Sequence, residues 1–173
     1  ANVGMMSALA QKDDVVFLDK GLHRNVFEGV KHCICKVLPH NDLNALEKAL
    51  QRYKADGRNL FVIIDGVYSQ DGDLGLVQEY LDISEKYNAM LIVDDSHGIG
   101  VLGETGAGLL EVKGILGKVP LVTGSLSKAF GTIGGYVSGR KELIDYIRYY
   151  AGSCFSASLP PPCLAAALKS LEL

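Results

Sequence analysis

Two patterns of apolar and polar positions alternate along this chain, and they predict strands separated by helices. Short runs that are mostly apolar are typical of strands covered on both faces of a parallel sheet. Such runs lie at residues 15–18, 33–38, 60–64, 89–93, 120–123 and 134–138. Between most of them, apolar residues recur at helical spacing. We therefore expect helices over residues 24–30, 43–53, 76–87 and 141–150.

This alternation predicts an α/β fold with a mostly parallel, doubly wound sheet. The connection before the strand at 134–138 is too short for a crossover helix, so we expect that strand to run antiparallel. Ligands bind such sheets beyond the carboxyl ends of the strands. Asp65, Asp94 and Thr123 stand at these predicted ends, so we expect the chemistry of the protein there.

Composition excludes some classes of function. The 173 residues carry a net charge of −3 with both signs interspersed, so no basic surface for nucleic acid is predicted. No apolar run approaches the roughly 18 residues that a membrane-spanning helix needs. We therefore expect a soluble protein without a transmembrane segment, in the cytoplasm or facing the cytosol.

The cysteines do not predict a metal site. Cys33 and Cys35 share one face of a predicted strand beside His32, but no second cysteine pair or paired histidine completes a set of four ligands. Cys154 and Cys163 lie far along the chain. We expect buried free thiols and no metal.

Two strand ends indicate pyridoxal phosphate (PLP) chemistry. Lys128 follows an apolar run, in a segment of small hydroxyl and glycine residues that would present its amine to a phosphorylated aldehyde. Asp94 ends another run and can hold the pyridine nitrogen protonated, and His97 can bond the phenolic oxygen of the ring. Taken alone, Asp94 would more readily be a strand cap and Lys128 a surface lysine. Their comparable positions on two strands favour the cofactor.

Further polar residues flank these positions. Thr123 and Ser125 frame the lysine with hydroxyl groups suited to a phosphate. His23, just after the first strand, can stack on a flat ring, although a lone histidine is more often structural. Ser69 lies in a turn rich in Asp and Gly and can donate to the ring oxygen, but a turn without a ligand explains it nearly as well.

In their order along the chain, these motifs resemble the α-oxoamine synthase family of fold-type-I PLP-dependent enzymes. The resemblance runs nearly end to end and depends on the combination. The segments that carry it are Ala1-Asn2-Val3-Gly4, His40-Asn41-Asp42, 65–73, 93–103, the loop of Lys128, Gly134-Gly135-Tyr136 and 156–161. Gln70 departs from the family, where methionine commonly follows the serine of its motif.

The resemblance implies the large-domain core of a fold-type-I transferase. The implied activity joins an acyl-CoA to a small amino acid (Ser, Ala or Gly), usually with loss of carbon dioxide, in a homodimer or heterodimer with its site at the interface. Lys128 would be the Schiff-base lysine and move protons at the α-carbon. The other implied roles are Asp94 at the pyridine nitrogen, His97 and Ser69 at the ring oxygen, His23 stacked on the ring, Thr123 and Ser125 near the phosphate or the lysine, and Ser156 at the phosphate of the neighbouring subunit.

Both ends of the chain fall inside helical patterns, so we expect residues 1–173 to be the central part of the PLP-binding large domain, without its N-terminal segment and C-terminal small domain. Residues 154–161 most resemble serine palmitoyltransferase. A protein of that kind is expected at the cytosolic face of a membrane. Residues 71–73 and 94–103 fit 8-amino-7-oxononanoate synthase and glycine C-acetyltransferase equally well. A fold-type-I aminotransferase or lyase, and a silent fragment or subunit that binds PLP without turnover, remain as alternatives.

Overall fold

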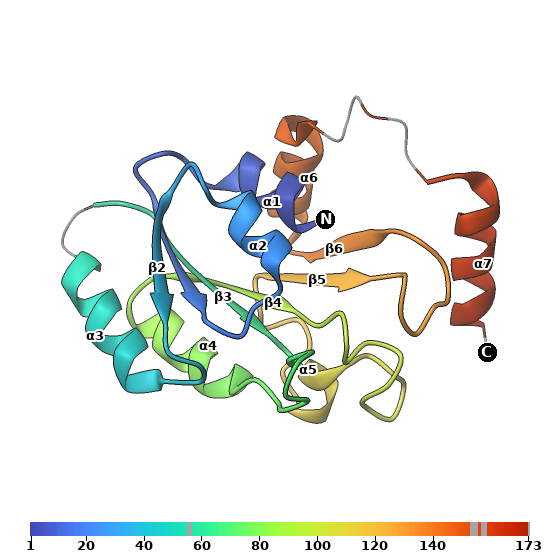
Figure 1. Ribbon diagram of the computed structural model, residues 1–173, viewed down its shortest axis with the longest axis horizontal. Helices are drawn as coiled ribbons and strands as arrows, with labels where there is room; N and C mark the ends of the chain where they lie inside the picture. The colour runs from blue at the N-terminus through green and yellow to red at the C-terminus, as the bar shows by residue number, and fades with distance from the viewer. Residues whose placement is uncertain (55–56, 153–155, 157–158, 173) are drawn as a thin grey trace.

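A six-stranded sheet forms the centre of the computed structural model, which describes residues 1–54, 57–152, 156 and 159–172 (Figure 1). Its strand order is β2-β1-β3-β4-β5-β6. The strands are β1 (Val15–Asp19), β2 (Ile34–Leu38), β3 (Leu60–Asp65), β4 (Met90–Asp94), β5 (Leu121–Ser125) and β6 (Gly135–Gly139). All neighbouring strands are parallel except β6, which runs antiparallel to β5. Both the mostly parallel sheet and its antiparallel last strand were predicted and are confirmed.

Helices cover both faces of the sheet, which confirms the doubly wound fold (Figure 1). One face carries α1 (Asn2–Leu9), α2 (Arg24–Gly29) and α6 (Lys141–Tyr150), and the other carries α3 (Leu43–Tyr53), α4 (Val77–Lys86) and α5 (Leu109–Val112). The last helix, α7 (Pro161–Leu171), stands beside the loop that joins β5 and β6 (Figure 1).

The continuous apolar runs follow from burial on both faces. Successive strand residues point to opposite faces, so Phe17 packs beneath α3 and α4 whereas Leu18 packs beneath α1 and α2. All five residues of β1 and all six of β3 are buried. A strand in this position is apolar up to its carboxyl end, since either face would otherwise bury unpaired polar groups, and the one polar residue of each strand, Asp19 or Asp65, stands at that end.

Local signals set the start of α3. Asp42 is its N-cap and accepts a hydrogen bond from the backbone N–H of Ala45 at 2.9 Å. Asn41, just before it, adopts a positive φ of 51°, which asparagine tolerates better than most residues. Leu46 and Leu50 place the apolar stripe of the helix against the sheet.

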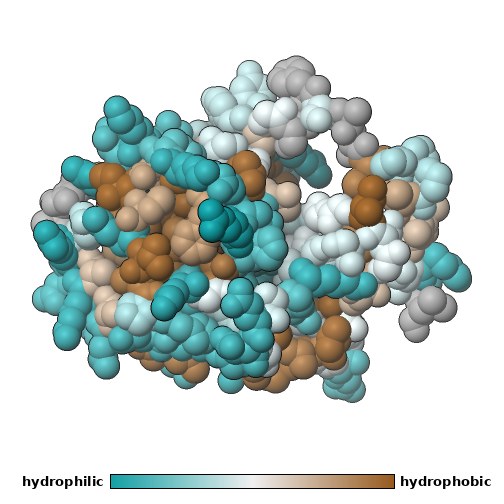
Figure 2. Space-filling model, in the orientation of Figure 1, coloured by the Kyte–Doolittle hydropathy of each residue, from teal (hydrophilic) through white to brown (hydrophobic). Residues whose placement is uncertain are grey.

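The expectation of buried thiols is wrong for Cys35. This residue is exposed, while Cys33 and Cys163 are half-buried, and all three are free. The reason is strand order: β2 lies at the edge of the sheet, and residues along it alternate between half-buried and exposed. Figure 2 shows apolar atoms at the surface over β2 and α2. Cys154 lies outside the described residues.

Within the described part of the chain, no group of three or more His, Cys, Asp or Glu side chains is placed to hold a metal ion. In the same residues, no helix is both long and apolar enough to cross a membrane.

Candidate active site

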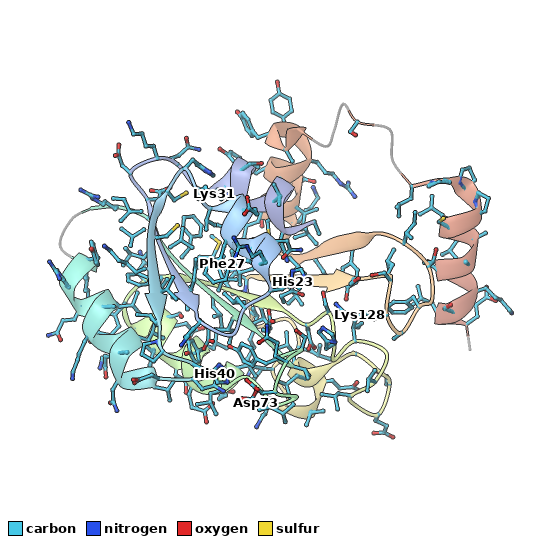
Figure 3. The ribbon with its side chains drawn as sticks, in the orientation of Figure 1. His23, Phe27, Lys31, His40, Asp73 and Lys128 are labelled. Atoms are coloured by element: carbon cyan, nitrogen blue, oxygen red, sulfur yellow. The ribbon has the colours of Figure 1, made fainter. Side chains whose placement is uncertain are left out.

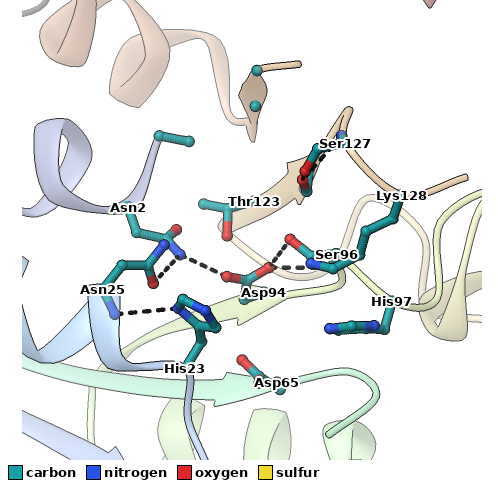
Figure 4. Close-up of a pocket in the computed structure, with 15 residues that line it drawn as sticks. Asn2, His23, Asn25, Asp65, Asp94, Ser96, His97, Thr123, Ser127 and Lys128 are labelled. Atoms are coloured by element: carbon teal, nitrogen blue, oxygen red, sulfur yellow. Dashed lines mark hydrogen bonds between the residues drawn. The ribbon is translucent and has the colours of Figure 1, made fainter. Parts of the chain in front are cut away.

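The carboxyl ends of β3, β4 and β5 meet at a cavity of about 350 Å³ (Figure 4). Register explains the meeting, because Asp65 pairs with Asp94 and Asp94 pairs with Thr123 across the parallel strands. The structure brings six of the eight predicted site residues to this cavity: Lys128, His97, His23, Asp94, Thr123 and Ser125.

Asp94 is buried and held by three donors. One carboxylate oxygen accepts the side-chain amide of Asn2 at 2.6 Å, and the other accepts the hydroxyl of Ser96 at 2.5 Å and its backbone N–H at 3.1 Å. These bonds stabilise the ionised carboxylate and fix its orientation. Asp94 is therefore built to face a cation, such as a protonated ring nitrogen.

Asn2 lies 92 residues from Asp94 in the sequence, so its part in the site was not predicted. Its amide also approaches the side-chain oxygen of Asn25 at 3.4 Å. Asn25 in turn donates its backbone N–H to Nδ1 of His23 at 3.2 Å. The chain of contacts from Asp94 through Asn2 and Asn25 to His23 links two predicted cofactor residues. Only the quoted segment 1–4 of the family resemblance hinted at it.

His23 is the N-cap of α2 and reaches the cavity from the side opposite the loop of Lys128 (Figure 4). The bond to Asn25 orients its imidazole ring. A flat ligand between β4 and this imidazole would have an aromatic face to stack on.

Lys128 extends from the loop between β5 and β6, toward His97 (Figure 4). The backbone of this loop is closed by hydrogen bonds from Leu126 to Gly134 at 2.9 Å and from Gly131 to Lys128 at 3.0 Å. Burial, with the positive charge of Lys128, lowers the pKa of His97 against the opposing charge of Asp94. The lowered pKa favours the neutral imidazole, which has one nitrogen to donate and the other to accept.

Asp65 is a site residue whose role was not predicted, although its place at a strand end was. It lines the cavity, is buried, and has one carboxylate oxygen without a hydrogen-bond partner among the described residues. Burial and the neighbouring charges of Asp94 and Asp19 raise its pKa to about 8. The neutral form of Asp65 is therefore favoured beside the hydrogen-bonded carboxylate of Asp94.

Hydroxyl groups line the β5 side of the cavity. Thr123 is buried and its hydroxyl has no partner among the described residues, while Ser125 and Ser127 bond each other at 2.7 Å. Gly124 lies between Thr123 and Ser125 in the chain and packs against Tyr136. A Cβ added at Gly124 would stand 2.4 Å from the tyrosine oxygen. An unpaired buried hydroxyl at the wall of a cavity fits a polar ligand with acceptor oxygens, such as a phosphate.

Two predicted residues lie elsewhere. Ser69 does not line this cavity but a neighbouring hollow beside α2, because the chain turns back after β3 with a bridge between Val67 and Leu74 that holds Ser69 at the tip. Its predicted contact with the ring oxygen is therefore not supported. Ser156 is exposed and does not line the cavity, and its contact with a neighbouring subunit stays a prediction.

The family model of the aminotransferases of class I and II matches residues 1–173. This chain belongs to that family. It is 42% identical to an 8-amino-7-oxononanoate synthase from Thermosipho melanesiensis, over 100% of the chain and 45% of that relative. It is 37% identical to a serine palmitoyltransferase from Sphingobacterium spiritivorum, over 100% of the chain and 44% of that relative. The chain therefore spans less than half the length of these relatives.

The fold is also similar to that of a solved serine palmitoyltransferase from S. paucimobilis with PLP and myriocin bound. The TM-score is 0.91 at 32% identity, over 99% of this chain and 44% of that one. These relatives confirm the resemblance to α-oxoamine synthases and the fold-type-I architecture predicted from the sequence.

Proposed function

We propose that this protein is a PLP-dependent acyltransferase that joins an acyl-CoA to a small amino acid. Residues 1–173 form the central part of its PLP-binding large domain. The observation that carries the proposal is the placement of Asp94, fixed by three donors, in one cavity with Lys128. The relatives named 8-amino-7-oxononanoate synthase and serine palmitoyltransferase support the same chemistry.

The residues of the cavity fit the cofactor. Asp94 would hold the proton of the ring nitrogen, His23 would stack on the ring, and His97 would bond the phenolic oxygen. Thr123, whose buried hydroxyl lacks a partner among the described residues, would donate to the phosphate together with Ser125.

When bound, PLP supplies an electron sink for negative charge at the α-carbon of an amino acid. Lys128 would hold the cofactor through its amine and would move the proton at the α-carbon of the substrate. Neutral His97 would hold a hydrogen bond at the phenolic oxygen. Asp94, as a fixed anion, would keep the ring nitrogen protonated during this proton transfer.

The proposal includes a dimer, in which Ser156 contacts the phosphate bound in the neighbouring subunit, and a cytoplasmic location. Ser, Ala and Gly are the amino acids to test. The similarity to 8-amino-7-oxononanoate synthases favours a role in biotin synthesis. The similarity to serine palmitoyltransferases favours a long acyl chain with serine.

The proposal is tested by the absorbance of the protein with added PLP. Lys128→Ala should abolish the visible band of a lysine-bound cofactor, whereas the matched variant Lys113→Ala, at an exposed lysine outside the cavity, should retain it. The wild type should then release free CoA thiol from an acyl-CoA in the presence of Ser, Ala or Gly. A folded wild-type protein without the band would overturn the cofactor assignment. Transamination of an added keto acid without CoA release would favour an aminotransferase.

A further inference from the structure

His40 lies between two carboxylates outside the cavity. Its Nδ1 is 2.8 Å from an oxygen of Asp19, and its Nε2 is 2.7 Å from an oxygen of Asp73 (Figure 3). A neutral imidazole has one N–H, so donating to both carboxylates requires the doubly protonated ring. The geometry therefore favours an imidazolium cation between the two carboxyl groups.

Asn41 repeats the same connection with different atoms. Its backbone N–H donates to the second oxygen of Asp19 at 2.8 Å, and its side-chain amide donates to Asp73 at 3.1 Å. The positive φ of Asn41 allows both bonds from consecutive residues. Two residues after β2 thus join the end of β1 to the loop that follows β3, and we call this group of four residues the carboxylate clamp.

On one side, the carboxylate clamp reaches the segment of His23. Asp19 is fully buried and also accepts the backbone N–H of Gly21 at 2.7 Å, two residues before His23. An added Cβ at Gly21 would stand 2.8 Å from the ring of Tyr68 and 3.1 Å from Nδ1 of His40. The turn that leads to His23 therefore packs directly against the clamp.

On the other side, the carboxylate clamp reaches the strand ends at the cavity. The backbone oxygen of Asp73 accepts the backbone N–H of Tyr68 at 3.0 Å, and this bond closes the loop after β3. The base of that loop is tied by a bond from Gly75 to Gly66 at 2.8 Å, and Gly66 donates its N–H to the backbone oxygen of Asp94 at 2.8 Å. Movement of Asp73 would thus be transmitted to the segment that follows Asp65.

The charged and titratable groups that face His40 are Asp19 from β1 and Asp73 and Tyr68 from the loop after β3, with Tyr80 of α4 beyond Asp19. Burial lowers the pKa of His40, but the hydrogen bonds and charges of Asp19 and Asp73 outweigh it, and the net pKa is raised. For a raised histidine pKa, the stabilisation is complete below the ordinary pKa and is lost as pH rises through the raised value.

We propose that His40, held as an imidazolium between Asp19 and Asp73, is a positioning residue that fixes His23 and the Asp65 strand end around the cofactor. The consequence for the cofactor rests on the proposed function. The consequence for His23 does not, because it concerns contacts within the chain alone. His40 touches no residue of the reaction directly and acts through the two segments that it joins.

The first test uses nuclear magnetic resonance of the histidine rings in the cofactor-free protein. His40 should titrate above the ordinary histidine range, and Asp73→Asn should lower its midpoint. His40→Asn should shift the ring signals of His23, whereas the control His32→Asn, at an exposed histidine outside the clamp, should not. Unshifted His23 signals in a folded His40→Asn protein would overturn the proposal.

The second test measures the dissociation constant of PLP by absorbance against pH. At a pH below the His40 midpoint, His40→Asn should bind PLP about tenfold more weakly than wild type, the value expected for a lost charge-assisted hydrogen bond. Above the midpoint the two proteins should converge, and His32→Asn should match wild type throughout. A twofold or smaller difference at every pH would overturn the proposal. If the wild type binds no PLP, the proposed function fails and the resonance test alone decides on the clamp.

Circular dichroism shows whether His40→Asn is folded and therefore which variant is used in these tests. If His40→Asn does not fold, Asp73→Asn replaces it, because the Asp73 side chain is 41% exposed and its loss is better tolerated. Asp73→Asn should also weaken the binding of PLP and shift the ring signals of His23. A folded Asp73→Asn protein with wild-type affinity and unshifted His23 would equally overturn the proposal.

Discussion

At the end of β4, Asp94 accepts three hydrogen bonds, whereas at the end of the neighbouring β3, Asp65 leaves one carboxylate oxygen without a partner among the described residues. The two residues pair in register and are buried to a similar degree. Donors distinguish them: Asn2 and Ser96 stabilise a negative charge on Asp94, while burial and that same charge raise the pKa of Asp65 to about 8. Identical side chains on adjacent strands therefore differ in how readily they hold a negative charge, because two close buried charges cannot both be stabilised without donors for both.

Removing the anion of the β4 end should have the largest effect. Asp94→Asn keeps the shape of the side chain but cannot hold the ring nitrogen protonated, so kcat should fall by at least about a hundredfold. Steady-state assays with acyl-CoA and amino acid measure this fall, with thermal unfolding to check that the variant is folded. Activity within tenfold of wild type would show that the donors around Asp94 serve the fold and not the reaction.

Removing the acid of the β3 end should instead stabilise the protein at high pH. In the unfolded chain Asp65 ionises near its ordinary pKa of 3.8, whereas the folded state keeps it neutral up to about 8, so ionisation favours unfolding as pH rises between these values. Asp65→Asn removes this dependence and should be more stable than wild type by up to about 6 kcal/mol at pH above 8, because the two pKa values differ by about four units at about 1.4 kcal/mol each. Urea unfolding of the cofactor-free proteins across this range measures the difference.

The same comparison of Asp65→Asn with wild type has a second expected result at low pH. The stability advantage of Asp65→Asn should shrink toward zero as pH approaches 4, where both states of the wild type carry a protonated carboxyl. An advantage independent of pH would mean that packing, and not ionisation, separates the two proteins.

A third carboxylate, just after the end of β4, is held by a backbone donor and by close packing against glycine. Asp95 follows Asp94, accepts the backbone N–H of Leu109 at 2.7 Å, and is packed so closely that a Cβ added at Gly98 would stand 2.2 Å from it. Gly98→Ala should therefore destabilise the fold by about 1 kcal/mol or more. The control Gly152→Ala, at a glycine with no atom within 4 Å of an added Cβ, should change the free energy of unfolding by less than about 0.5 kcal/mol. Equal effects of the two substitutions would contradict the close packing around Asp95.

The sequence alone was sufficient for the sheet and for the place of Lys128 and Asp94 at one cavity. Strands buried on both faces had to be apolar, so β1 and β3 were visible as unbroken runs, and a short connection required β6 to be antiparallel. Lys128 and Asp94 were predicted together because parallel strands bring their carboxyl ends to one edge. These features depend on local pattern and on one general rule of topology.

The sequence could not indicate which partner each polar residue finds. Asn2 reaches Asp94 across 92 residues, and His40 reaches Asp73 across 33. Neither spacing has a local signature, since both contacts exist only once strands and loops have packed. The place of Ser69 in a neighbouring hollow could not be read from the sequence for the same reason, because the bridge between Val67 and Leu74 is set by the folded loop, and its contact with the ring oxygen stays a prediction.

By itself, then, the sequence determined the strands, their helical cover and the strand ends where the chemistry gathers, because burial of apolar surface acts on patterns of neighbouring residues. Tertiary structure decided the exposure of Cys35 on an edge strand, the raised pKa of Asp65 beside Asp94, and the position of His40 between two carboxylates, which raises the pKa of the histidine. These depend on burial, distance and donors in three dimensions. Electrostatic free energy in a protein is set by what surrounds a charge after folding, and not by its neighbours in the chain.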